Sequence, residues 1–171
     1  MPLIKLMQKR VANLSIGSST LRGQGKNAKR IAIGFLKNMD LGGFSNINNE
    51  REFTDRLNYH TKLLKEQLPN RSWGAARKAL NIFMFQAAHD IYLSEAYRLK
   101  DIISFLEVPL DNFNGKGLVK EARQRNLKLH WRSIKDLNKD DSDRFQRFAK
   151  QYAKDKYNCE RCYLDLYFWR E

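Results

Sequence analysis

Lys78 is the residue of this chain whose type and position are best suited to covalent chemistry. It follows a glycine-containing turn and stands near the start of an almost wholly apolar stretch. A helix N-terminus carries a partial charge of about +0.5, which repels an ammonium group, and burial disfavours the charged form further. Both effects lower a lysine pKa from about 10.4 and favour a neutral, nucleophilic amine. The alternative is a lysine that reaches solvent or holds a phosphate.

Asp111 is the second candidate. Pro109 disfavours a helical conformation at Val108, so a helix that ends near Leu106 must stop there. Asp111 then stands where an N-cap or first-turn carboxylate belongs, which is a structural role in its own right. The sequence alone does not show whether its carboxylate meets Lys78.

The two segments together resemble the helix-hairpin-helix DNA glycosylases. The run Gly-Ala-Ala-Arg-Lys-Ala-Leu-Asn at 74–81 is similar to the hairpin and second helix of the endonuclease III branch, which reads Gly-Val-Gly-Arg-Lys-Thr-Ala-Asn. In that family the lysine is the Schiff-base nucleophile, and an essential aspartate opens a later helix. Glu-Val-Pro-Leu-Asp-Asn-Phe at 107–113 fits this second element. Asp111 follows Lys78 by 33 residues, a separation similar to that of the archaeal 8-oxoguanine glycosylase branch.

The chain also departs from the family pattern. Ala76 replaces the second hairpin glycine, so a left-handed backbone is harder to reach there. Asn112 and Phe113 replace the Thr-His or Ser-His that often follows the aspartate. The four cysteines of the endonuclease III iron–sulfur cluster are absent. These differences affect the grip on DNA and the choice of branch more than the lysine–aspartate pair.

The resemblance implies an all-α fold, a two-lobed helical bundle with a helix-hairpin-helix motif and a groove between the lobes. It implies one domain over 1–171, with the hairpin region at about 55–90 and the aspartate segment at about 106–125. The implied function is a DNA glycosylase with lyase activity that excises a damaged or modified base, with 8-oxoguanine as a candidate. Lys78 would be the nucleophile and Asp111 its electrostatic and acid–base partner.

Other residues are assigned by the same resemblance. A flipped base needs aromatic and amide contacts, and the candidates are Gln24, Trp73, Phe85 and Trp169, with Trp131 and Phe168 as further aromatics. Most aromatics in such a chain belong to its core. Phosphates would be held by backbone N–H groups at the helix start and by nearby cations. The predicted backbone contacts are Arg71, Gly74, Arg77, Lys116 and Lys120.

Apolar residues recur at helical spacing in most of the chain, and strand-like alternation is missing. The spacing predicts helices over 3–14, 27–38, 50–67, 74–89, 98–106, 115–125, 142–156 and 160–169. The helix at 74–89 is apolar on several sides, which predicts that it is buried. Glycines at 115 and 117 are turn signals.

The net charge of +13 points to a polyanionic partner. Residues 1–40 hold eight Lys or Arg against one acid, and 115–135 hold seven against one, which predicts a basic face. Double-stranded DNA is the expected partner, bound by a monomer. We find no long apolar run and no signal-peptide pattern, so we expect a cytoplasmic, nucleoid-associated protein and no membrane partner.

Cys159 and Cys162 form the only Cys-x-x-Cys of the chain. A structural zinc site needs four ligands, so we expect neither a metal nor a cofactor. Motifs for nucleotide triphosphates, dinucleotides and metalloproteases are also missing. Two alternatives to the enzyme remain open. One is a non-enzymatic helix-hairpin-helix DNA-binding module or a subunit of a DNA repair or phage-defence complex. The other is a protein-interaction component without DNA chemistry.

Overall fold

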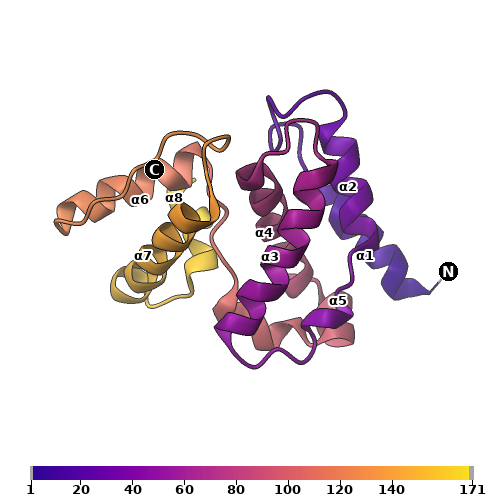
Figure 1. Cartoon of the computed structure of the whole chain (residues 1–171). Coiled ribbons are helices and arrows are strands. Elements are labelled where there is room, and N and C mark those ends of the chain that lie inside the picture. The colour runs from indigo at the N-terminus through magenta and orange to yellow at the C-terminus, as the bar shows by residue number, and fades with distance from the viewer. Residues whose placement is uncertain (1, 170–171) are drawn as a thin grey trace.

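The computed structural model describes residues 2–169, and over this range the chain is helical and has no strand, which confirms the all-α prediction. In this part of the chain, eight α-helices are joined by loops and short 3-10 segments (Figure 1). The α-helices are α1 (Leu3–Ser15), α2 (Ala28–Asn38), α3 (Glu50–Gln67), α4 (Trp73–His89), α5 (Ile91–Tyr97), α6 (Asn112–Gln124), α7 (Lys139–Tyr157) and α8 (Leu164–Phe168). The 3-10 segments are η1 (Gly42–Phe44), η2 (Leu99–Phe105) and η3 (Arg161–Tyr163).

The region after α4 differs from the prediction. The stretch expected to be a helix at 98–106 contains the 3-10 segment η2, and α5 precedes it. Asp90 starts α5 because its carboxylate accepts a hydrogen bond from the Leu93 N–H, which is a typical N-cap contact. Arg98 then ends α5 in a left-handed conformation, with φ of 53°. The N-cap at Asp90 and the left-handed residue Arg98 therefore set the two ends of α5, and the hydrophobic spacing predicts neither.

The helices form two groups, each around its own hydrophobic cluster. The first cluster draws its buried side chains from α1 to α5 and η2, and the second from α6, α7 and α8. Figure 1 shows the two groups side by side, with α3 and α4 on the side of the first group that faces the second. Eleven residues of α4 are buried, which confirms the prediction for this helix. Its first residue, Trp73, packs against the second cluster.

A buried ion pair lies under α4. Arg77 is only 1% exposed, and its Nε lies 3.0 Å from Oε2 of Glu107. Its other nitrogens donate hydrogen bonds to Thr61 Oγ1 (2.8 Å) and Asn58 Oδ1 (2.7 Å) on α3. Asn81, one turn further along α4, donates to the same carboxylate oxygen of Glu107 at 3.1 Å. The network joins α3, α4 and the segment that leads to the second group of helices.

The connecting segment 106–111 is also fixed from the other side. Gln146 of α7 exchanges two hydrogen bonds with the backbone of Val108, accepting at 3.1 Å and donating at 2.8 Å. The buried Arg161 donates to the carbonyl oxygens of Phe105 and Leu106 at 2.7 and 3.0 Å. Because buried backbone groups need partners, these side chains let a non-helical segment run through the interior. These polar contacts therefore help to set the relative position of the two groups.

Removing one partner of the buried ion pair should destabilise the whole chain. We expect Glu107→Ala to lower the free energy of unfolding by about 3–5 kcal/mol, because Arg77 would keep a buried charge without its counter-ion. The measurement is urea denaturation followed by circular dichroism. The matched control is Asp55→Ala, since Asp55 pairs with Arg51 at an exposed site and its loss should cost less than about 1 kcal/mol. Equal losses in the two variants would contradict the role given to Glu107.

Candidate functional site

The structure brings Lys78 and Asp111 together. Nζ of Lys78 lies 3.3 Å from Oδ2 of Asp111, and the two side chains are 12% and 17% exposed. Lys78 belongs to the second turn of α4, whereas Asp111 precedes α6, so each group of helices supplies one member. An amine and a carboxylate meet at a site that is mostly dry but open to solvent. A nucleophile and a proton acceptor require such an arrangement.

The two oxygens of Asp111 have different partners. Oδ1 accepts hydrogen bonds from the backbone N–H groups of Phe113 (3.0 Å) and Asn114 (3.1 Å), so Asp111 is the N-cap of α6. Oδ2 is the oxygen that faces Lys78. The predicted N-cap position is therefore confirmed, and it does not compete with the ion pair. The cap fixes the carboxylate, and the fixed carboxylate positions the amine.

The local sequence of α4 explains why Lys78 lies where it does. Ser72 caps this helix, since its Oγ accepts from the Ala75 N–H at 3.2 Å. Successive residues of a helix are about 100° apart around the axis, so Arg77 and Lys78 reach different parts of the neighbouring segment. Arg77 pairs with Glu107 and Lys78 with Asp111, four residues later. Two consecutive cations on one helix thus hold two acids of the connecting segment.

A third charged residue, Asp165 of α8, lies close to this pair. Asn114 Nδ2 donates to Asp165 Oδ1 at 2.6 Å and to the Pro109 carbonyl oxygen at 2.6 Å. Burial raises the pKa of Asp165 above its usual value, while the hydrogen bond from Asn114 lowers it. The charge of Asp111 raises this pKa further and that of Lys78 lowers it, so both groups are near enough to act. Sequence analysis missed Asp165, because a lone Asp in an aromatic C-terminal run carries no signal of its own.

The four residues predicted to contact a base lie in different surroundings. Gln24 is 1% exposed, and neither atom of its amide has a hydrogen-bond partner within residues 2–169. Its loop is tied to the α3–α4 turn, since Asn70 Nδ2 donates to the Gly23 carbonyl oxygen at 3.1 Å. A buried amide without a hydrogen-bond partner is costly, and the described residues leave both the donor and the acceptor of Gln24 unused. The amide is enclosed in this structure.

The predicted aromatics divide into packed and exposed side chains. The ring of Trp73 lies over the Arg77 guanidinium, at 4.9 Å from its carbon to the ring centre. Phe85 is about 10 Å along α4 from Lys78 and packs against His89 and Tyr163. Trp169, in contrast, is 69% exposed. The structure therefore places Trp73 and Phe85 in packing roles and leaves Trp169 open to a ligand.

The further aromatics are also packed. Trp131 lies against Gly115 and makes an edge contact with Phe145, and Phe168 is 8% exposed. They belong to the second hydrophobic cluster. The general expectation that most aromatics are core residues holds for these two.

Two of the predicted backbone contacts, Arg77 and Gly74, are buried. Arg77 is buried in the ion pair with Glu107, so its guanidinium does not reach solvent or a phosphate. Gly74 is buried inside α4, where a Cβ would come within 2.2 Å of the Ile134 carbonyl oxygen. The glycine serves the close approach of the loop at 134, and this loop covers the helix start that was expected to bind phosphate. At both positions neighbouring structure occupies the space that the prediction assigned to DNA.

The other predicted backbone contacts are exposed. Arg71 has a left-handed φ of 45° in the α3–α4 turn, and its side chain is 71% exposed. Lys116 and Lys120 lie on α6, and with Arg123 they make no ion pair within residues 2–169. These three residues of α6 line a surface pocket of about 510 Å³ together with His130 and Trp131. The three cations of α6 are available to an anionic ligand, whereas Arg71 pairs with Glu66 at 3.8 Å.

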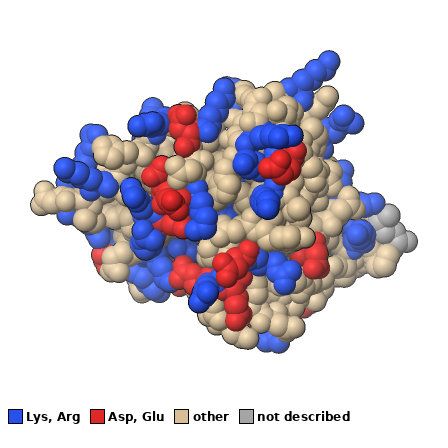
Figure 2. All heavy atoms as spheres, viewed as in Figure 1, with Lys and Arg blue, Asp and Glu red and all other residues tan. Residues whose placement is uncertain are grey.

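The charged surface is mixed. Figure 2 shows Lys and Arg over much of the visible face, with acids gathered toward its middle and lower part.

Within residues 2–169 no helix is both long and apolar enough to cross a bilayer. The same range contains no group of three or more His, Cys, Asp or Glu placed to hold a metal ion. Cys162 is buried, and burial raises the pKa of its thiol to about 12.

The raised pKa of Asp165 gives a prediction with a defined sign. An acid whose pKa is raised in the folded state favours folding below its unfolded pKa, and this contribution is lost as the pH rises through the folded pKa. Asp165→Asn keeps an acceptor for Asn114 and removes the charge. We therefore expect the melting temperature of the variant, relative to the native chain, to increase from pH 3 to pH 7.

Asp155 provides a control of opposite sign. A hydrogen bond from Arg125 lowers the pKa of this exposed carboxylate. Asp155→Asn should lose stability relative to the native chain as the pH rises from 3 to 7. Thermal melts over this pH series measure both effects. Parallel trends in the two variants would contradict the placement of Asp165 in a dry, charged site.

Comparisons with known proteins do not extend this description. Searches against models of protein families, curated proteins and solved structures found no match to the chain. The functional interpretation therefore rests on the geometry of Lys78, Asp111 and Asp165 and on the sequence pattern around them.

Proposed function

We propose that the chain is a DNA glycosylase with lyase activity that removes a damaged or modified base, with 8-oxoguanine as a candidate. One observation carries the proposal: Lys78 Nζ lies 3.3 Å from Asp111 Oδ2 although the residues are far apart in sequence. The resemblance of 74–81 and 107–113 to the helix-hairpin-helix glycosylases assigns a nucleophile and its partner to these two positions. It is improbable that the two residues assigned by the resemblance would meet by chance at a partly open site.

The chemistry begins with proton transfer. Lys78 Nζ gives a proton to Asp111 Oδ2, and its freed electron pair attacks C1′ of the deoxyribose. The bond between C1′ and the base breaks, and its electron pair leaves with the base, which takes up a proton. The departing base takes this proton from Asp111, and the restored negative carboxylate stabilises the positive charge left on the sugar and on Nζ.

The covalent intermediate then permits strand cleavage. Nζ loses a second proton, the C1′–O4′ bond opens, and O4′ takes up a proton, which leaves a protonated imine between Nζ and C1′. This imine acidifies the C2′ position. Loss of a C2′ proton expels the 3′ phosphate with the electron pair of the C3′–O bond, which is a β-elimination.

In the proposed glycosylase, the two groups of helices are the two lobes, and the DNA-binding groove lies between them at Lys78 and Asp111. The target base has to leave the duplex stack before Nζ can reach C1′. Arg71 on the first lobe and Lys116 and Lys120 on the second supply exposed cations for the phosphates. Gln24, whose buried amide has no hydrogen-bond partner among the described residues, is the candidate for reading a base edge once its loop moves.

A second function is supported by the capping role of Asp111. The carboxylate starts α6 whether or not chemistry follows, and the ion pair also joins the two groups of helices. A DNA-binding module without catalysis would use the same contacts. This alternative predicts binding to DNA that is sensitive to salt and indifferent to the charge of Asp111.

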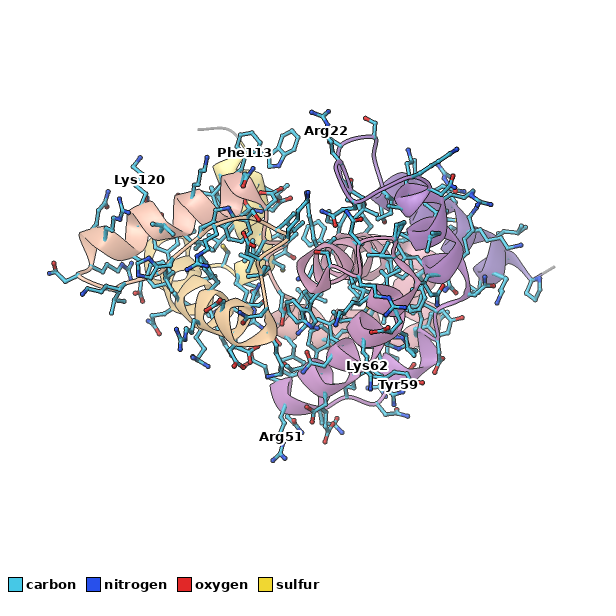
Figure 3. The ribbon with its side chains drawn as sticks, turned by 45° about the horizontal axis from the view of Figure 1, so that its top comes forward. Arg22, Arg51, Tyr59, Lys62, Phe113 and Lys120 are labelled. Carbon is cyan, nitrogen blue, oxygen red and sulfur yellow. The ribbon has the colours of Figure 1, made fainter. Side chains whose placement is uncertain are left out.

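Borohydride trapping tests the covalent step. Duplexes that contain an abasic site or 8-oxoguanine should give a reduced protein–DNA adduct with the native chain and none with Lys78→Gln. The matched control is Lys62→Gln, because Lys62 is an exposed lysine of α3 (Figure 3) and should leave the adduct yield unchanged. An adduct that persists in Lys78→Gln at the native level would assign the chemistry to another amine.

Asp111→Asn separates catalysis from capping. Asparagine caps a helix about as well as aspartate, so the fold should persist, but the negative charge is lost. We expect the rate of adduct formation to fall about 100- to 10,000-fold, the usual contribution of a general acid–base group. A variant that traps DNA at the native rate, or a native chain that never traps it, would leave the binding module as the function.

A further inference from the structure

Two large aromatic side chains are exposed together beside the Lys78–Asp111 pair. Phe113 in the first turn of α6 is 66% exposed, and Trp169 at the end of α8 is 69% exposed. Their ring centres are 6.1 Å apart, and the ring planes are inclined by 37°. Aromatic rings contribute most when they are buried, so an adjacent exposed pair marks a binding surface. Figure 3 shows Phe113 at the upper edge of the molecule, directed away from the ribbon.

Both rings are tied to the site through the backbone. The N–H of Phe113 donates to Asp111 Oδ1, the oxygen next to the one that faces Lys78. Asp165 is held by Asn114, and it precedes Trp169 by one turn. A ligand in contact with the two rings would therefore lie beside the ion pair. The resemblance assigns a polar residue to the position of Phe113, so the exposed ring is a feature of this chain.

The surroundings of the rings favour a nucleobase. Lys116 follows Phe113 on α6, and Lys120 and Arg123 continue the cationic stripe along the same helix without ion-pair partners within residues 2–169. Rings that are flanked by unpaired cations match a ligand that combines flat bases with phosphates. Every base presents a π face, so stacking of this kind tolerates any sequence.

We propose that Phe113 and Trp169 form a stacking surface for an unpaired nucleobase. The preferred DNA then carries a bulged or mismatched base, because such a base leaves the duplex at the lowest cost. The inference rests on the proposed function in taking DNA as the ligand, but it requires no chemistry at Lys78. It names the substrate class: DNA with a locally unpaired base rather than an intact duplex.

Binding measurements at one fixed salt concentration test the proposal. The full chain is titrated into a fluorescent duplex, the same duplex with one unpaired 2-aminopurine, and the corresponding single strand. The native chain should bind the bulged duplex more tightly than the intact one and should quench the 2-aminopurine. Phe113→Ala and Trp169→Ala should each weaken binding of the bulged duplex by about 5- to 150-fold and relieve the quenching. Binding of the intact duplex should change little.

Matched variants separate stacking from general effects. Tyr59→Ala removes an aromatic side chain of similar exposure (57%) from α3, at the lower edge of Figure 3, and should change nothing. Phe113→Trp should retain the preference for bulged DNA, and Phe113→Leu should lose most of it, because leucine keeps apolar area without a π face. Melting temperatures should stay near the native value, since Phe113 is mostly exposed.

The outcomes distinguish the two proposals. If the native chain binds none of the DNA probes, the proposed function itself fails. If it binds DNA but Phe113→Ala and Trp169→Ala keep the native preference and quenching, the stacking surface is wrong and DNA binding stands. Ring-dependent binding to anionic lipid vesicles in place of bulged DNA would also overturn the inference.

Discussion

Two consecutive cations of α4 set the arrangement on which the rest of the structure depends. Arg77 holds Glu107 in the interior, and Lys78 holds Asp111 at the edge of the solvent. The two acids belong to the short segment that passes from the first hydrophobic cluster to the second. Burying a charge is costly unless its partner is present, so this segment cannot slide by even one residue without leaving an ion unpaired. The two ion pairs therefore fix how the connecting segment aligns with α4, and this alignment places Asp111 beside Lys78.

The two pairs differ in what they leave available for chemistry. Every contact of the Arg77 guanidinium is internal, with Glu107, Thr61 and Asn58 as its partners, and the side chain is 2% exposed. The pair of Lys78 and Asp111 keeps 12% and 17% exposure. A fully buried pair serves structure alone, whereas a partly open pair can exchange protons and meet a ligand. Arg77 thus gives rigidity beneath the site, and its neighbour Lys78 gives access from solvent.

The sequence predicted the helical class, the burial of α4 and the N-cap at Asp111, because hydrophobic spacing and cap chemistry are local signals. It assigned Arg77 to a phosphate, since no local signal shows that Glu107 pairs with this guanidinium in the interior. Asp165 was missed because its role comes from contacts with Asn114, 51 residues away. Gly74 was assigned to DNA because the hairpin was expected to hold phosphates through backbone N–H groups at a helix start, but the loop at Ile134 packs on it. Each of these features depends on a long-range contact that no local pattern encodes.

The glycines of α6 show how packing sorts the aromatic residues near the site. Gly115 and Gly117 read as turn signals, yet both lie inside α6. A Cβ at Gly115 would come within 2.3 Å of the Trp131 indole, and one at Gly117 within 2.8 Å of the Phe168 ring. Each glycine thus makes room for a ring that packs against the helix. Phe113 stands on the same helix without such a recess, and its ring stays outside with that of Trp169. The chain therefore packs two of its aromatic rings against α6 and presents two others where the ion pair opens.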